Sequence, residues 1–337
     1  MNDFTRQVNQ AAEAARQGRR PDPEDAARWI EPRDLDELGQ LMAAAGSLRA
    51  TAEGDTVELC AIVNARSGRC SEDCAFCAQS AHYPGKAEVY PLLSAEEMVR
   101  RGRAAAQAGA QRFGIVTSGK GCPTGQALDE ICRAIEVLTS EGVIAPCGSL
   151  GLLEPSQARR LRNAGLVRYH HNLEAGPSYF DSICTTHAYG DRVATIKTAQ
   201  DAGLEVCVGG IVGLGESPAQ RVELAQATAE LKPESIPLNF LNPIPGTPLA
   251  NLEPLTPMQA LAAVAVFKLF NPQATVRTCG GRQQVLGNLA PLMYLAGAGG
   301  TMVGDYLTTE GRQASQDLAD LASLGLRPAD KLAKEAS

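Results

Sequence analysis

The sequence predicts a parallel (β/α)8 barrel of the TIM type with an N-terminal helical extension. From Val57 onward, short β-branched or apolar runs alternate with longer stretches of helical character. Eight such repeats over about 250 residues are typical of an eight-stranded parallel barrel. A hydrophobic content of 44% and a charged content of 20% fit a globular protein with a well-buried core. A doubly wound open sheet would show a similar rhythm and is the alternative.

The first 50 residues are charged and helix-like, and we expect residues 1–50 to form the extension. In the stretch PDPEDAARWIEP, Pro21 and Pro23 suit the start of a helix and Pro32 suits its end. The N-terminus lacks the apolar core of a signal peptide, and no apolar run reaches the roughly 18–20 residues that cross a bilayer. The sequence therefore predicts a cytoplasmic protein without a membrane partner.

Residues 51–308 form the predicted barrel. Its expected strands are 57–65, 111–118, 143–150, 166–174, 204–213, 235–242, 274–280 and 300–304. Among the helices between them, 94–110 opens with a capping box of Ser94 and Glu97. The helices in 156–165 and 192–203 each end in a glycine. Residues 309–337 are expected to form a C-terminal tail.

Charge and cysteine content narrow the class of function. A net charge of −7 argues against a nucleic-acid partner, which would require a basic surface. Ten cysteines in a reducing compartment more often bind metal or react than form a disulfide framework.

Three of the cysteines, Cys70, Cys74 and Cys77, follow the first predicted strand in the pattern C-x3-C-x2-C. Active sites of (β/α)8 barrels gather at the C-terminal ends of the strands, so this loop lies at that end. Thiolates select zinc, copper(I) or iron–sulfur clusters. A structural zinc site closes with four ligands, and His82 is the nearby residue that would complete one. A non-catalytic zinc protein is therefore an alternative from another class.

The same motif, with Phe76 directly before the last cysteine, resembles the signature of the radical S-adenosylmethionine (SAM) superfamily. The resemblance implies a [4Fe–4S] cluster in which Cys70, Cys74 and Cys77 bind three irons. The fourth iron takes the amine and carboxylate of SAM, which one electron splits into methionine and a 5′-deoxyadenosyl radical.

Further stretches resemble the biotin synthase family, from about Val57 to about Thr308. They are NAGLVRYHHNLEAGPSYFDSICTTHAYGDRVATI, AGLEVCVGGIVGLGES, ESIPLNFLNPIPGTPL and VRTCGGRQ. The resemblance implies sulfur insertion into dethiobiotin, a flavodoxin or ferredoxin as electron donor, and a homodimer. It assigns SAM binding to Phe76, Glu174, Arg192 and Ile211, and substrate binding to Asn172, Asn239 and His170. An amide offers both a donor and an acceptor, as a urea ring requires; where this chain has His170, the family often has another asparagine.

The chain departs from the family at a second, inner cluster. The family's [2Fe–2S] cluster is held by three cysteines and one arginine; Cys147, Cys207 and Arg277 match them, but Gly114 stands where the third cysteine belongs. Cys279 lies two residues after Arg277, so both side chains face the same side of the strand. The resemblance with this change predicts an auxiliary cluster, of the [2Fe–2S] or a four-iron type, at Cys147, Cys207, Cys279 and Arg277.

Other readings of these cysteines stay open. Cys122, in the loop after the second strand, is a possible fourth ligand, whereas Cys60, Cys132 and Cys184 are interpreted as small buried hydrophobic residues. The second cluster would be absent if the inner cysteines only pack. Related radical SAM enzymes, such as the hydrogenase-cofactor maturase and the methylornithine synthase, would not need that cysteine set and are the alternative function.

Overall fold

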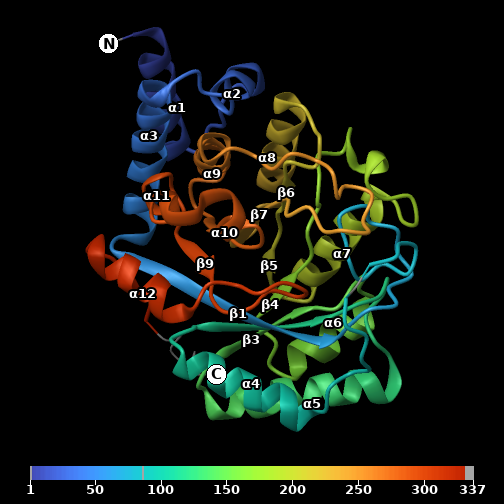
Figure 1. Ribbon diagram of the computed structural model, residues 1–337. Coiled ribbons are helices and arrows are strands. Elements are labelled where there is room, and N and C mark those ends of the chain that lie inside the picture. The colour runs from blue at the N-terminus through green and yellow to red at the C-terminus, as the bar shows by residue number, and fades with distance from the viewer. Residues whose placement is uncertain (1, 86, 331–337) are drawn as a thin grey trace.

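The computed structural model describes residues 2–85 and 87–330 and contains a closed parallel barrel (Figure 1). The ring closes because its last strand pairs with its first. Its strands are β1 (Thr56–Arg66), β2 (Arg112–Thr117), β3 (Ala145–Ser149), β4 (Arg168–His170), β5 (Glu205–Cys207), β7 (Ser235–Phe240), β8 (Thr275–Thr278) and β9 (Gly300–Met302). The predicted (β/α)8 fold is confirmed, and the open sheet is excluded.

The predicted strand 204–213 is divided in the structure into β5 and a short β6 (Gly210–Val212), which pairs with β7. A Cβ atom on Gly209 would lie 2.1 Å from the carbonyl oxygen of Pro237, and one on Gly210 would lie 2.5 Å from that of Glu174. Glycine permits this close approach of backbones. The two glycines therefore bring three chain segments together at the C-terminal end of the barrel.

Helices cover the outside of the barrel. The main ones are α4 (Ala95–Gln107), α5 (Gly125–Glu141), α6 (Pro155–Asn163), α7 (Tyr189–Asp201), α8 (Pro218–Leu231) and α9 (Pro257–Phe270). Short turns are η1 (Phe180–Ser182), α10 (Arg282–Leu286), η2 (Gly287–Leu289) and α11 (Leu292–Leu295). Ser94 caps α4 as predicted, accepting from the backbone N–H of Glu97 at 3.3 Å. The Glu97 side chain does not complete the box, because it binds Arg100 and Arg101.

The N-terminal segment forms three helices: α1 (Asp3–Arg16), α2 (Pro23–Trp29) and α3 (Leu35–Glu53). Asp22 caps α2, Pro23 occupies its first turn, and the helix ends before Pro32, as the prolines predict. These helices pack on the outer layer, α3 against α9 and α2 against α8 (Figure 1). Trp29 is 2% exposed, so the extension shares a core with the barrel helices.

The described part of the predicted C-terminal tail contains α12 (Ala314–Ser323) and β10 (Arg327–Pro328). β10 pairs in parallel with the start of β1, and the buried ion pair of Arg282 with Asp317, at 2.6 Å, holds α12. Residues 331–337 lie outside the described residues. The domain boundaries at 50 and 308 stay predictions.

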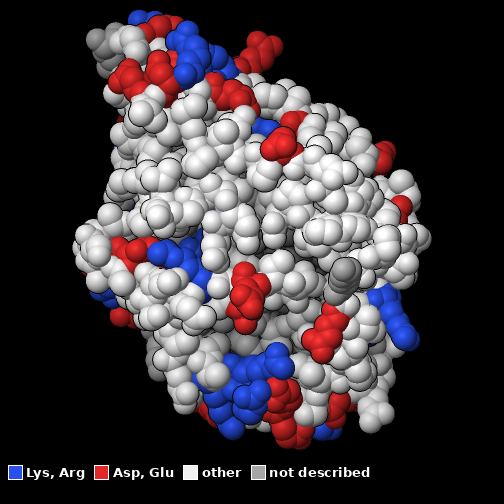
Figure 2. Space-filling model, viewed as in Figure 1, with Lys and Arg blue, Asp and Glu red and all other residues white. Residues whose placement is uncertain are grey.

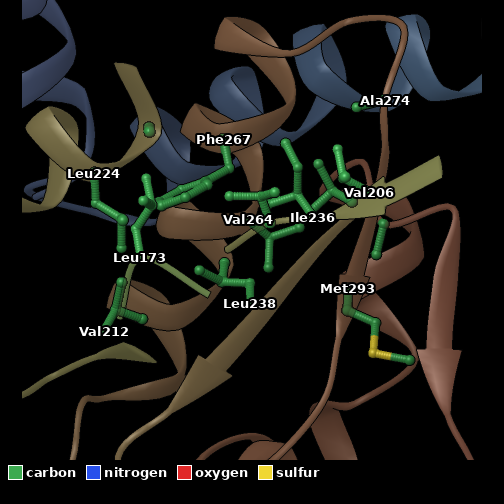
Figure 3. Close-up of a cluster of buried hydrophobic side chains, with 14 of the residues drawn as sticks. Leu173, Val206, Val212, Leu224, Ile236, Leu238, Val264, Phe267, Ala274 and Met293 are labelled. Atoms are coloured by element: carbon green, nitrogen blue, oxygen red, sulfur yellow. The ribbon is translucent and has the colours of Figure 1, made fainter. Parts of the chain in front are cut away.

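The main apolar core lies between the strands and the helices. In the part drawn in Figure 3, Ile236 and Leu238 of β7 lie among Val264 and Phe267 of α9 and Leu224 of α8. Because successive side chains of a strand point to opposite faces, this outer core leaves the other face of each strand for the barrel interior. The residues that could do chemistry are found on that inner face.

Figure 2 shows most of the charged residues toward the edges of the view and a few acidic groups nearer its centre. At its lower edge, over α4 and α5, basic and acidic groups lie side by side, as in the ion pairs of Arg100 with Glu97 and Arg103 with Glu141. Among the described residues, no helix is both long enough and apolar enough to span a bilayer.

Candidate active site

A cavity of about 400 Å³ lies at the C-terminal ends of the strands. The loop after β1 contributes the three motif cysteines, Cys70, Cys74 and Cys77, to its wall. Eight further predicted site residues line it: Phe76, His170, Asn172, Glu174, Arg192, Ile211, Asn239 and Cys279. The structure therefore brings the expected cluster loop, SAM residues and substrate residues around one space.

The cysteine loop is held by the segment that follows η1. Glu72 and Asp73, both within the motif, accept hydrogen bonds from that segment. Thr185 N and Thr186 N donate to Asp73 at 2.9 and 3.2 Å, and Thr186 Oγ1 and His187 Nδ1 contact Glu72 at 2.8 and 2.6 Å. These hydrogen bonds lower the pKa of both carboxyls against the opposing effect of burial. The two carboxylates therefore fix the shape of the loop that presents the thiols.

We expect Asp73→Ala to weaken iron retention by the loop about 10- to 100-fold, the usual effect of removing a partner that orients metal ligands. The measurement is the rate of iron loss to a chelator from anaerobically reconstituted protein. Asp181→Ala, in the exposed part of η1, is the matched control and should behave as wild type. Equal rates for all three proteins would contradict this role for Asp73.

Among the described residues, no three His, Cys, Asp or Glu side chains converge closely enough to hold a single metal ion. His82 is occupied elsewhere, since its Nε2 lies 2.9 Å from the carbonyl oxygen of Ser71. A zinc ion needs four donors about 2.0–2.3 Å from one point, whereas the thiolates around a larger cluster stand further apart. The histidine that the zinc alternative requires is engaged by the backbone.

The cavity wall also carries a strained, charged group. Glu174 has φ = 69°, in the left-handed region that a non-glycine residue rarely adopts. Its carboxylate lies 3.6 Å from Arg192, and burial raises its pKa despite that guanidinium. Arg192 Nη1 donates to the carbonyl oxygen of Asn172 at 2.9 Å, while its buried Nε has no partner. An unpaired donor beside an acidic group fits a zwitterionic ligand such as SAM.

The two predicted substrate asparagines differ in how far the protein satisfies them. Asn239 bridges strands, donating to the carbonyl oxygen of Gly210 at 3.1 Å and accepting from Gly280 N at 2.9 Å. Asn172 donates to Glu174 at 3.3 Å, but its buried Oδ1 has no partner. Because a buried orphan acceptor is costly, Asn172 is the residue best prepared to accept a hydrogen bond from a ligand N–H.

Below the cavity lies a layer of charged residues inside the barrel. Glu58 of β1 contacts Arg112, Arg168 and Arg277, which come from β2, β4 and β8. Burial alone would raise the pKa of Glu58, but the three guanidiniums together lower it. Arg277 also donates to Ser235 Oγ at 2.7 Å. This layer closes the bottom of the barrel and puts positive charge beneath the layer of thiols that lies between it and the cavity.

The next layer contains sulfur. Cys147 and Cys207 are fully buried, Cys279 is 1% exposed, and these three predicted ligands surround the upper side of the arginine layer. Cys60 also belongs here, because its thiol interacts with Arg277, Cys147 and Cys207. Cys60 is fully buried, as its interpretation as a small buried residue predicts, and the structure adds that it lies beside the predicted ligands. The sequence VELCAIVNA already indicates that Cys60 faces the barrel interior, because the polar residues Glu58 and Asn64 lie on the same face of the strand.

The remaining cysteines lie elsewhere. The backbone N–H of Cys122 donates to the carbonyl oxygen of Leu152 at 2.9 Å, which fixes the position of this residue. Its sulfur interacts with Cys132 of α5 rather than with the inner thiols. The structure does not bring it to the inner layer. Cys184 Sγ lies 3.8 Å from Cys74 Sγ, beside the cluster loop.

The donor sets described above fit the implied groups. The cavity wall has three thiols on one loop, and the layer below has further thiols on an arginine floor. A (β/α)8 barrel with this cysteine loop at its C-terminal end defines the class of radical SAM enzymes. Consistent with this, residues 65–227 match the Radical SAM superfamily, and residues 237–327 match the Biotin and Thiamin Synthesis associated domain.

The particular family follows from closer relatives. The chain is 51% identical over 286 residues to the biotin synthase of Geobacter sulfurreducens, covering 85% of this chain and 87% of that protein. It is 50% identical over 289 residues to that of Syntrophotalea carbinolica, covering 86% and 88%. The chain therefore belongs to the biotin synthase family, whose members are sulfur-inserting radical SAM enzymes.

Solved structures agree on the fold. A methylornithine synthase superposes with a TM-score of 0.83 at 17% identity, covering 95% of this chain and 98% of that one. A maturase of the [FeFe]-hydrogenase superposes with a TM-score of 0.80 at 16% identity, covering 96% and 76%. At this identity the likeness shows the shared barrel alone.

Proposed function

We propose that this protein forms biotin from dethiobiotin, taking the inserted sulfur from an inner auxiliary iron–sulfur cluster. The observation that carries the proposal is the stacking of three features along the barrel axis. The motif cysteines line the cavity, Asn172 with its unpaired, buried Oδ1 belongs to the cavity wall, and the inner thiols are buried beneath. A substrate in the cavity would lie between the two sets of sulfur.

The chain's own residues would bind and orient the reactants. When bound, the [4Fe–4S] cluster and SAM supply a carbon radical that removes hydrogen atoms from the substrate. Cys70, Cys74 and Cys77 would hold that cluster. Arg192 would pair with the SAM carboxylate, and Glu174 would lie near the SAM ribose. Phe76 and Ile211 contribute apolar side chains to the cavity wall. Positioning of this kind, rather than acid–base chemistry, is what the geometry offers.

The substrate contacts follow from the amide groups. Asn172 would accept from a ureido N–H, and the bridging Asn239 would fix the other side of the ring. His170 would take the position of the family's third amide. Cys147, Cys207, Cys279 and Arg277 would surround the auxiliary cluster, of [2Fe–2S] or four-iron type. We also propose a flavodoxin or ferredoxin as electron donor and a homodimeric assembly, both on the family resemblance.

The test is direct. Reconstituted protein incubated anaerobically with dethiobiotin, SAM and a low-potential reductant should form biotin, detected by mass spectrometry, with consumption of SAM. Omitting SAM should abolish the product. Cleavage of SAM while dethiobiotin stays unchanged would contradict the proposal. That result would favour a related radical SAM activity of the maturase or methylornithine synthase kind.

A further inference from the structure

Cys60 lies on the inner face of β1, between two residues whose contacts settle their orientation. Glu58, two residues before it, reaches arginines of three other strands inside the barrel. Ile62, two residues after it, lines the cavity. Because side chains alternate along a strand, the fully buried thiol of Cys60 points into the barrel between the arginine floor and the cavity.

The neighbouring strand explains why a thiol is needed there. Gly114 of β2 pairs with Ile62 on one side and Cys147 on the other. A Cβ atom on Gly114 would lie 3.1 Å from Cγ2 of Ile62, so Ile62 leans over the position from which a cysteine would project. β2 contributes no sulfur, and Ile62 would have to shift slightly to admit a side chain at Gly114. β1, the adjacent strand, carries its cysteine on the same inner surface.

Four thiols from four strands thus share the interior: Cys60 of β1, Cys147 of β3, Cys207 of β5 and Cys279 just after β8. Each is at most 1% exposed, and all are free thiols. The charge of Cys60 interacts with Cys147 and Cys207, and that of Cys279 with Cys60 and Cys207. Two buried atoms of the same region, His170 Nε2 and Arg277 Nη1, lack partners. The unpaired donor Arg277 Nη1 beside clustered thiols points to a missing anionic group.

Arg277 is poorly placed to act as a metal ligand itself. An arginine ligand, as in the family's [2Fe–2S] site, needs a nitrogen that has given up its proton, and a guanidinium gives up a proton only with difficulty. Here Nη2 is bound to the Glu58 carboxylate and Nε donates to Ser235, so the protein holds the group in its charged form. A cation beneath thiolates stabilises them by charge and hydrogen bonding.

We propose that Cys60 is a ligand of the inner cluster and completes a four-thiolate set with Cys147, Cys207 and Cys279, while Arg277 acts as a counter-charge. The inference rests on the proposed function only in assuming that an inner iron–sulfur cluster forms. It assigns the thiol that replaces the one missing at Gly114, and it removes Cys122 from the ligand set.

The experiment measures inner-cluster iron separately from the cavity cluster. In a parent variant with Cys70, Cys74 and Cys77 all changed to alanine, the remaining iron and acid-labile sulfide report the inner cluster alone. Cys60→Ala and Cys60→Ser are added to this parent, with Cys132→Ala, a buried cysteine of α5, and Cys122→Ala as controls. All five chains are reconstituted anaerobically, and the cluster type is read by Mössbauer spectroscopy.

We expect both Cys60 variants to lose most of the inner-cluster iron, and both controls to retain the parent's content. Serine is nearly the size of cysteine, so Cys60→Ser decides the matter should the alanine variant unfold, as circular dichroism would reveal. Full iron retention with unchanged Mössbauer parameters in Cys60→Ser would overturn the inference. Biotin formation by the wild type is measured separately. If the wild type forms biotin and Cys60→Ser keeps its inner cluster, this inference is wrong but the proposed function stands. If the wild type forms no biotin and Cys60→Ser loses its inner cluster, the proposed function is wrong but this inference stands.

Discussion

Cys74→Ala should abolish biotin formation and remove about four irons per chain, the content of one [4Fe–4S] cluster. The physical reason is the number of ligands. The loop offers three thiols, and losing one leaves two irons without a protein ligand. Cys74 is 9% exposed and is the most buried of the three motif cysteines. Iron and sulfide analysis, with electron paramagnetic resonance of the reduced protein, measures the loss.

Cys184→Ala is the sharp comparison, because its sulfur lies only 3.8 Å from that of Cys74. Cys184 is outside the C-x3-C-x2-C motif, and we expect its alanine variant to keep the cavity cluster. Cys132→Ala, on the outer helix α5, tests the general effect of deleting a buried thiol. Iron loss in Cys184→Ala together with retention in Cys74→Ala would show that the ligand had been assigned to the wrong cysteine.

The barrel could be predicted because its signal is local and repeated. Apolar strand runs and helical stretches alternate with little interruption, and caps such as Ser94 and Asp22 act within a few residues. The division of β5 from β6 could not be predicted in the same way. Its cause is the approach of Pro237 and Glu174 to two glycines, which depends on segments far apart in the chain.

The candidate site shows the same division. Because alternate residues of a strand face the same side, the sequence was enough to predict that Cys279 shares the face of Arg277. The position of Cys60 beside the inner thiols was not predicted, because the apolar residues around it made β1 look uniformly buried, although Glu58 and Asn64 share its face. The docking of Asp73 onto Thr185 joins residues 112 positions apart and has no local signal at all. Contacts of that length become visible only once the strands are arranged in space.

Glu58→Gln should cost about 3–5 kcal/mol of folding free energy, the usual result of removing one partner from a buried ionic network. Arg277, Arg112 and Arg168 have side chains only 1%, 4% and 4% exposed, so each would keep its charge without this carboxylate. Glu205→Gln is the matched control. Its side chain also pairs with Arg112 and Arg168 but is 37% exposed, and its loss should cost less than about 1 kcal/mol.

The pH dependence of this effect has a definite sign. The folded-state pKa of Glu58 is lowered, so its contribution is fully present above the unfolded-state value of about 4.3 and is lost as pH falls below it. Urea unfolding of wild type and Glu58→Gln should therefore show a large difference at pH 7 that narrows toward pH 3. A difference that is small at pH 7, or that grows as pH falls, would mean that Glu58 does not hold the arginine layer together. The floor beneath the inner thiols would then need another source of stability.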